Sequence, residues 1–320
     1  MSTPLPLRPF GKTDLRVTPL CVGCAELGNM PETFAYEVAQ DQALATLRAA
    51  LASPINFLDT SAIYGHGESE RRIGLVLRER GGLPKGIVLA TKADRDPQTN
   101  DFSGEQIKRS VERSLKLLGL DRIQLMYIHD PEHTTFENIV GPGGPLEVLQ
   151  RFQEQGLIEH LGISGGPIDM LTRYVETGAF VAVETHNRYT LLNRSAAPLL
   201  DVAAARGVAV VNAAPYGSGM LAKGPEAYPR YAYQDAPAEL LDRARRLAAI
   251  CQEYNVPLAA AALQFSMRDP RVTTTVVGMT RPERIAQTVE LARHPIPDEI
   301  WPRLDAVGFD TSDPEEHRFR

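Results

Sequence analysis

Short runs of apolar and β-branched residues alternate with segments of helical periodicity along the whole chain, and this alternation constrains the fold most. Runs such as Leu20–Gly23 and Gln124–Ile128 are apolar at nearly every position, which is typical of strands buried on both faces. We therefore predict eight strands, over Leu20–Gly23, Asn56–Asp59, Ile87–Thr91, Gln124–Ile128, His160–Ser164, Ala182–His186, Val208–Asn212 and Val272–Val277.

Helical segments separate these strands. Strands that alternate with helices pair in parallel through crossover connections, and eight such strands can close into a barrel filled by side chains. A doubly wound open sheet is disfavoured because no G-x-G-x-x-G follows the first strand. The sequence thus predicts an α/β fold, a (β/α)8 TIM barrel. Its helices are expected over Ala39–Leu51, Glu68–Arg80, Gly104–Leu118, Pro145–Gln155, Ile168–Thr177, Ala197–Ala205, Pro237–Tyr254 and Pro282–Ala292.

Three segments lie outside the repeat. Leu7–Val17 has turn residues at its centre and is expected to form an N-terminal hairpin. A loop over Ala213–Gln234, rich in Gly, Pro and Tyr, precedes two helices before the last strand, and its composition suits ligand binding. One extra short helix is expected beyond Pro297. No domain boundary is visible, so residues 1–320 are expected to form a single domain.

Charge and cysteine content limit the partners. Lys and Arg number 34 and Asp and Glu 40, a net charge of −6 that gives no general attraction to nucleic acid or anionic membranes. No apolar run approaches the ~20 residues of a membrane span, and the N-terminus lacks a signal-peptide pattern. Cys21 and Cys24 are expected to be free core thiols, without a second pair to form a zinc site. We expect a cytoplasmic protein with no metal; the sequence leaves its oligomeric state open.

Reactive side chains gather where three neighbouring strands end. Asp59 and Tyr64 follow the second strand, Lys92 ends the third and His129 ends the fourth. Because barrel enzymes react at the carboxyl ends of their strands, we expect these four residues to share one site. A lysine ammonium beside Tyr64 would pull the phenol pKa towards neutrality, Asp59 would keep Lys92 charged, and His129 would orient a substrate oxygen.

These motifs resemble those of the aldo-keto reductases. The resemblance rests on Asp59–Gly65, Ala90–Lys92 and Met126–Pro131, with further similarity at Leu161–Ser164 and Val277–Arg284. It implies hydride transfer between a nicotinamide dinucleotide and a carbonyl carbon. Asp59, Tyr64, Lys92 and His129 would be the catalytic residues, and Tyr64 would exchange the proton.

The resemblance also implies a cofactor site along the rim. Ser164 matches the family's serine after strand five, His186 stands where a family glutamine holds the carboxamide, and Ala213 replaces a stacking aromatic residue. The glycine-rich turn Gly217–Leu221 offers backbone amides to a pyrophosphate. The expected cofactor-binding residues are Ser164, His186, Pro215, Tyr216, Gly217, Ser218, Met220, Gly278, Arg284 and Thr288.

An arginine in the position of Arg284 suggests NADP, since an arginine fork is a common partner of the 2′-phosphate. The family's preceding lysine is replaced by Gly278, so NAD is expected to be usable too.

Several functions fit these residues. The stretches from His186 to Asn193 and from Asn212 to Tyr216 most resemble the aldose 1-dehydrogenase branch, which includes L-fucose and L-galactose dehydrogenases and oxidises the anomeric hydroxyl to a lactone. Asn187 and His186 would then meet ring hydroxyls. Leu27, Met30 and Ile63 form an apolar wall that suits an NADPH-dependent reductase of small aldehydes or ketones.

Two other classes stay open at this stage. A class I aldolase would use Lys92 as a Schiff base, which requires an uncharged lysine and conflicts with a nearby Asp59. A non-catalytic cofactor sensor, as in the channel subunits of the same family, is compatible with intact motifs. In each enzymatic reading the partner is a small carbonyl or sugar molecule.

Overall fold

Eight parallel strands close into a barrel in the computed structural model, which describes residues 4–316. Their order is β12, β3, β4, β5, β6, β7, β8 and β9, and β12 pairs with both β3 and β9. This confirms the predicted fold class. The barrel strands are β3 (Leu20–Gly23), β4 (Phe57–Asp59), β5 (Val88–Ala93), β6 (Ile123–His129), β7 (Ile158–Ser164), β8 (Ala182–His186), β9 (Ala209–Ala213) and β12 (Thr274–Gly278).

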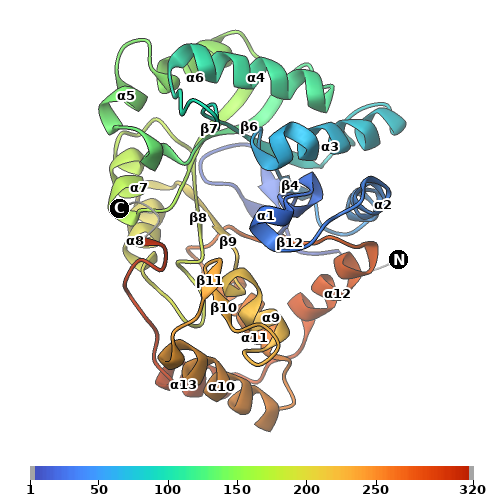
Figure 1. Cartoon of the computed structure of the whole chain (residues 1–320), viewed down its shortest axis with the longest axis vertical. Helices are drawn as coiled ribbons and strands as arrows, with labels where there is room; N and C mark the ends of the chain where they lie inside the picture. Colours follow the sequence, from blue (N-terminus) through green and yellow to red (C-terminus); the bar gives the residue numbers. More distant parts are fainter. Residues whose placement is uncertain (1–3, 317–320) are drawn as a thin grey trace.

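Helices surround these strands, as Figure 1 shows. They cover the outer face of the barrel with apolar side chains, which is why the strands are buried on both faces. The main helices are α2 (Gln40–Leu51), α3 (Glu68–Glu79), α4 (Gly104–Leu118), α6 (Pro145–Glu154), α7 (Ile168–Glu176), α8 (Ala197–Arg206), α10 (Ala238–Glu253), α11 (Leu258–Arg268) and α12 (Pro282–Arg293).

The N-terminal hairpin forms as predicted and closes one end of the barrel. Its strands β1 (Arg8–Pro9) and β2 (Arg16–Val17) pair antiparallel. Phe10 is fully buried, and its ring meets that of Phe57 edge-on at 5.7 Å between centroids. The hairpin therefore adds to the core inside the barrel.

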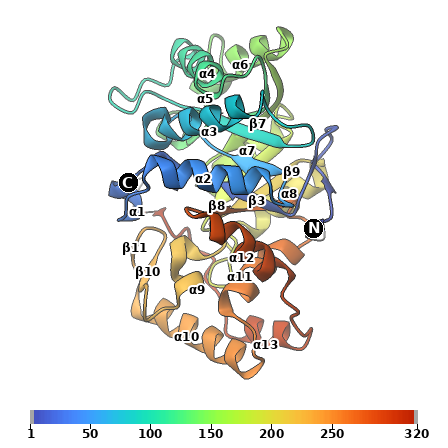
Figure 2. The same cartoon turned by 90° about the vertical axis from the view of Figure 1, so that its right-hand side faces the viewer.

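The loop over 213–234 is more ordered than its composition predicts. It contains the 3-10 turn η4 (Gly217–Gly219), the short helix α9 (Met220–Lys223) and a small hairpin of β10 (Arg230–Tyr231) and β11 (Gln234–Asp235). In Figure 2 this hairpin, α1 and the C-terminal end of the chain lie on one side, opposite the N-terminal end. The other short elements are η1 (Glu26–Gly28), α1 (Pro31–Phe34), η2 (Tyr64–Gly67), η3 (Pro131–His133) and α5 (Phe136–Val140).

The C-terminal tail folds back onto the barrel after the expected extra helix, α13 (Ile300–Ala306). Arg188 is fully buried and donates to Glu315 at 2.8 Å and to Asp313 at 2.6 Å. The tail thereby covers the end of β8.

Two smaller expectations concern sulfur and membranes. Cys21 and Cys24 are free and buried, as predicted, and burial raises the pKa of both thiols. Among the helices of residues 4–316, none has the length and apolar character needed to cross a bilayer.

Candidate active site

The four predicted catalytic residues come together at one rim of the barrel. Asp59 ends β4, Lys92 lies near the end of β5, and His129 ends β6. The Lys92 ammonium donates to a carboxylate oxygen of Asp59, to the carbonyl oxygen of Thr60 at 3.0 Å and to the Tyr64 hydroxyl at 3.4 Å. The rings of Tyr64 and His129 stand perpendicular, 5.8 Å apart between centroids.

Close backbone packing fixes the position of Tyr64. Gly65 has a φ of +58°, and a Cβ built on it would lie 1.9 Å from the carbonyl oxygen of Gly28. Only glycine fits both the left-handed conformation and that contact. The turn η2, which carries Tyr64, is therefore held against η1.

Lys92 is fully buried between two carboxylates, those of Asp59 and Glu184. Glu184 on β8 lies 3.5 Å from the ammonium. Burial alone would lower the pKa of Lys92, but the two carboxylates outweigh it and raise the pKa well above its usual value. The ammonium therefore stays charged, which contradicts the aldolase alternative because a Schiff base requires a neutral amine.

Tyr64 differs from the sequence-based expectation in its electrostatics. Burial raises the pKa of the phenol well above 10, and the charge of Lys92 opposes that effect without reversing it. The expected shift towards neutrality is thus wrong in its net direction, because desolvation of a phenolate is costly inside the protein. At neutral pH the hydroxyl keeps its proton.

His129 has two acidic neighbours. Its Nδ1 lies 2.6 Å from Asp94, and its Nε2 lies 3.5 Å from Asp130. Burial would lower the pKa of this imidazole, but Asp130 and Asp94 raise it to about 9. The site therefore holds a buried cation at His129 as well as at Lys92.

Comparison with known proteins identifies the family of this arrangement. The model of the aldo/keto reductase family matches residues 19–308, which spans the whole barrel. The chain belongs to the aldo/keto reductase family. A solved aldo-keto reductase from Bacillus halodurans, in its holo form, is similar with a TM-score of 0.78 and 25% identity. That similarity covers 98% of this chain and 99% of the other.

Several curated relatives are dehydrogenases. D-threo-aldose 1-dehydrogenase of a Pseudomonas species is 34% identical over 91% of this chain and 94% of the relative. Pyridoxal 4-dehydrogenase of Microbacterium luteolum is 32% identical over 94% and 97%, and L-galactose dehydrogenase of Arabidopsis thaliana 29% over 95% and 95%. This aldo-keto reductase is an oxidoreductase, similar to aldose dehydrogenases.

Unpaired donors at the rim fit a bound dinucleotide. The Nδ2 of Asn187 and the hydroxyl of Tyr216 are buried without a hydrogen-bond partner within residues 4–316. A ligand rich in oxygen acceptors would satisfy both. Of the predicted cofactor-binding residues, Ser164, His186 and Gly278 end β7, β8 and β12.

The glycine-rich turn differs from its expected role. The amides of Gly217 and Gly219 donate within the turn, to Ala214 at 3.0 Å and to Tyr216 at 3.2 Å. They are therefore not free for a pyrophosphate in this structure. The Ser218 hydroxyl donates to Oδ1 of Asn187 at 3.2 Å, which ties the turn to β8.

The outer end of the expected cofactor groove contains opposite charges. Arg284 is exposed in the first turn of α12, and its guanidinium donates to Gln287 at 3.4 Å. Burial raises the pKa of Tyr216, and the charge of Arg284 opposes that effect. The Glu26 carboxylate lies so close to Gly278 that a Cβ there would be 2.0 Å from Oε1.

Several predicted site residues do not face an open site. Leu27 is fully buried, because the 3-10 turn η1 directs it into the core beside Leu20. Asn187 is also fully buried, and its Oδ1 accepts from the Ser218 hydroxyl, so its unpaired Nδ2 is the side-chain atom left to contact a ligand. The side chain of Met220 packs in the core, and the Thr288 hydroxyl donates to the carbonyl of Arg284 at 2.7 Å.

The remaining predicted residues lie at the rim or just beneath it. His186 is bonded through Nε2 to Glu315 at 2.8 Å, although 27% of its side chain is exposed. Ser164 is buried at the end of β7, and Pro215 is buried between β9 and η4. Met30 and Ile63 are partly exposed and stay candidates for the substrate wall.

Several acidic residues near the site were not predicted from the sequence, among them Asp130, which directly follows His129. Asp94 follows Lys92 by two positions, and the alternation of a strand could have placed both on one face. Glu184 is an acid within a strand predicted to be buried on both faces, which is itself a signal. No sequence pattern indicated that Glu315 would contact His186 and Arg188, because only the fold of the C-terminal tail brings it to the end of β8.

Proposed function

We propose that this aldo-keto reductase oxidises an aldose at C1 to a lactone with a nicotinamide dinucleotide. Two observations support the proposal: the compact arrangement of Asp59, Tyr64, Lys92 and His129, and the similarity to two aldose dehydrogenases along nearly the whole chain. The alternative function is reduction of small aldehydes or ketones with NADPH. It would use the same residues, with Tyr64 as the proton donor instead of the acceptor.

Side chains of this protein would accept the proton of the substrate hydroxyl and orient its oxygen. The bound dinucleotide supplies the acceptor for the C1 hydrogen and its electron pair. Tyr64 in its phenolate form, which burial disfavours at neutral pH and which forms as the pH rises, would take the proton of the anomeric hydroxyl, and the C1–O bond would become a carbonyl. Lys92 stabilises the phenolate from 3.4 Å, and His129 donates to the substrate oxygen and orients it.

The polarity of the rim favours a hydroxylated substrate. Burial would raise the pKa of Asp130, yet His129, His186 and His133 hold it below its usual value, so this carboxylate is ionised beside the site. A charged acceptor among imidazoles can bind hydroxyl groups and reject isomers that leave it unpaired. Met30 and Ile63 provide a smaller apolar surface on the other side.

A second substrate class follows from one relative. Pyridoxal, the compound in the name of the Microbacterium luteolum relative, carries a hydroxymethyl group next to its aldehyde and can close to a cyclic hemiacetal. Aldoses also exist as cyclic hemiacetals. The common chemical group would be a carbon that bears one ring oxygen and one hydroxyl.

We expect free aldoses to support reduction of NAD(P) at millimolar concentration, with strong discrimination between isomers that differ in one hydroxyl. The measurement is the absorbance of the reduced nicotinamide, with the lactone identified by NMR. Pyridoxal and a set of aliphatic and aromatic aldehydes, the latter assayed with NADPH, complete the panel. Rapid aldehyde reduction without any aldose or pyridoxal oxidation would replace this proposal by the aldehyde-reductase alternative, and no turnover at all would favour the cofactor sensor.

For the cofactor we propose NADP, with NAD usable. Arg284→Ala should weaken NADP binding by about ten- to hundredfold, as expected for loss of a charge-assisted hydrogen bond, and NAD binding by less than about twofold. Fluorescence titration of the protein with each dinucleotide measures both constants. Burial raises the pKa of Glu26 to about 7, and in its ionised form this side chain near Gly278 opposes a phosphate and suits ribose hydroxyls, which adds to the replaced lysine as a reason to expect NAD binding.

Arg281→Ala is the matched control, since it removes an exposed arginine from the N-cap of the same helix. Equal losses for NADP and NAD in Arg284→Ala, or equal effects of the two arginine variants, would contradict the role given to Arg284.

A further inference from the structure

Asp94 is a buried carboxylate directly behind the proposed catalytic histidine. It follows β5 and is 3% exposed. Its Oδ2 accepts from the Ser61 hydroxyl at 2.5 Å and from the amide of Ile63 at 2.9 Å, while its Oδ1 lies 2.6 Å from Nδ1 of His129. The residue therefore joins the turn that carries Tyr64 to the strand that carries His129.

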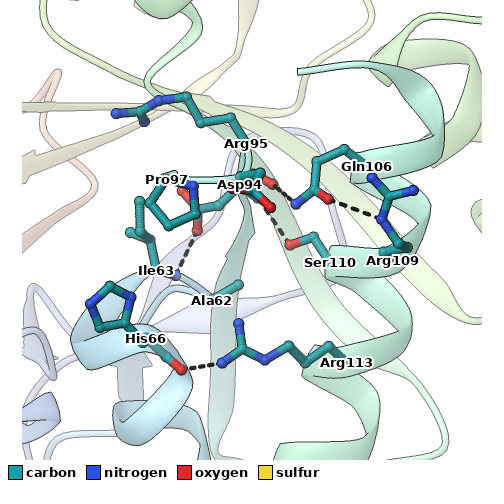
Figure 3. Close-up of a pocket in the computed structure, with 11 residues that line it drawn as sticks. Ala62, Ile63, His66, Asp94, Arg95, Pro97, Gln106, Arg109, Ser110 and Arg113 are labelled. Carbon is teal, nitrogen blue, oxygen red and sulfur yellow. Dashed lines mark hydrogen bonds between the residues drawn. The ribbon is translucent and has the colours of Figure 1, made fainter. Parts of the chain in front are cut away.

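Helix α4 fixes the backbone of Asp94. Its amide donates to the Ser110 hydroxyl at 3.0 Å, and its carbonyl accepts from Gln106 at 3.1 Å. Figure 3 shows Ser110, Gln106 and Ile63 converging on Asp94, whereas the side chain of Arg95 points away. The carboxylate is thus held in place from both sides.

The nearby arginines do not neutralise this carboxylate. Arg109 and Arg113 line the cavity of about 210 Å³ next to Asp94, but Arg109 donates to Gln106 and Asp101, and Arg113 to the carbonyl of His66. Within residues 4–316, His129 is the cationic side chain in ion-pair contact with Asp94. A buried carboxylate with one such partner favours the charged form of that partner.

The contacts of Asp94 also determine which nitrogen of His129 carries a proton. A carboxylate can only accept hydrogen bonds, so at the 2.6 Å contact Nδ1 is the donor to Oδ1, and the Ser61 hydroxyl, which also lies 3.1 Å from Nδ1, donates to Oδ2. A neutral imidazole with its proton on Nδ1 has a bare Nε2, which cannot donate to a substrate oxygen. Nε2 becomes a donor only when His129 is an imidazolium.

We propose that Asp94 is a positioning residue of this reaction, which fixes the Nδ1 proton of His129 and makes its Nε2 a donor through the imidazolium form. The proposal rests on the function proposed above, in which His129 orients the substrate oxygen. Asp94 itself touches neither substrate nor cofactor and acts through His129.

Other charged groups around His129 help to set the pH range in which it is an imidazolium. Asp130 follows it directly after the end of β6, Lys92 comes from β5, and Glu184 comes from β8. Burial and Lys92 lower the pKa of His129, and Asp130 and Asp94 raise it, with a result of about 9. Since Asp94 raises this pKa, its removal should shift the loss of the imidazolium towards neutral pH.

Asp94→Asn is the test, because asparagine keeps the shape and can still accept from Ser61 and Ile63. We expect the NMR titration midpoint of the His129 imidazole, assigned by comparison with His129→Gln, to fall by more than one pH unit. We also expect kcat/KM to fall by roughly ten- to hundredfold near pH 8 and by much less near pH 6, where both proteins hold the imidazolium.

Two controls separate this role from a structural one. Asp96→Asn removes the same charge two residues away, where the carboxylate accepts from backbone amides of its own loop, and it should leave the His129 midpoint unchanged. In the His129→Gln background, Asp94→Asn should cause no further loss of rate. An equal loss at pH 6 and pH 8, or an additive loss in that background, would overturn the proposal.

The wild-type titration keeps the proposal falsifiable even if Asp94→Asn does not fold. A wild-type midpoint of His129 below 7 would overturn it directly. Because the NMR titration needs no substrate, failure of the sugar proposal and failure of this one are distinguishable.

Discussion

Replacement of Tyr64 by phenylalanine is expected to lower kcat by ~10²–10⁴, because the reaction loses its positioned proton-transfer group. Binding of the dinucleotide should change by less than about twofold, since the Tyr64 hydroxyl has Lys92 as its hydrogen-bond partner at 3.4 Å and not a residue of the cofactor rim. Steady-state kinetics with the substrate found in the panel and fluorescence titration of the cofactor measure the two effects.

Tyr127→Phe is a matched control for this experiment. The ring of Tyr127 also lies near the Lys92 ammonium, at 5.8 Å from its centroid, and its buried hydroxyl has no partner within the described chain. Loss of this second phenol should leave most of the rate, because Tyr127 is fully buried and cannot reach substrate. If Tyr64→Phe retained more than about half of the wild-type rate, the role assigned to Tyr64 would be wrong.

Lys92→Met is expected to damage both stability and catalysis. The substitution leaves Asp59 and Glu184 buried without their common cation, and breaking a buried ion pair in this way costs about 3–5 kcal/mol of unfolding free energy. Urea denaturation measures that loss. Glu184, whose pKa burial already raises to about 7, should then take up a proton more readily because Lys92 no longer opposes the effect.

The same substitution should shift the pH dependence of oxidation upward. Oxidation needs the phenolate of Tyr64, so its rate rises with pH as the phenol loses its proton. Burial raises the pKa of Tyr64 and Lys92 lowers it, so removal of Lys92 raises the pKa further and moves the rise in rate to higher pH. The pH profile of kcat for aldose oxidation records this shift.

Asp59→Asn provides the opposite control. Asp59 raises the pKa of Tyr64, so its neutralisation should move the pH profile downward. It should also cost less stability than Lys92→Met, because Glu184 remains as a counter-ion for the ammonium. Shifts in the same direction for both variants would contradict the electrostatic coupling between Lys92 and Tyr64.

The strands and the catalytic rim were predictable from the sequence for the same physical reason. Strands buried on both faces are apolar throughout, and parallel strands bring their carboxyl ends to one edge. Asp59, Lys92 and His129 could therefore be placed together without knowledge of side-chain contacts. Tyr64 followed because it lies in the loop directly after β4.

The misplaced residues lie where the chain leaves regular structure. Leu27 sits in a 3-10 turn, and Asn187 has a φ of +59° just after β8, so neither follows the alternation of a strand. Helical or strand periodicity cannot predict the direction of such side chains. The contact between Arg188 and Glu315 joins residues 127 positions apart in the sequence and leaves no local pattern.

The contacts of residues 313–315 with Arg188 limit how much of the structure can form while the chain is still being synthesised. Synthesis proceeds from the N-terminus, and early parts of a chain begin to fold while later parts are still being added. Until residues 313–315 have emerged from the ribosome, Arg188 lacks the two acidic partners of its buried position, Asp313 and Glu315. β3 likewise remains an open strand edge until β12 arrives to pair with it. The nascent barrel therefore depends on protection of that edge until residues 274–278 have been translated.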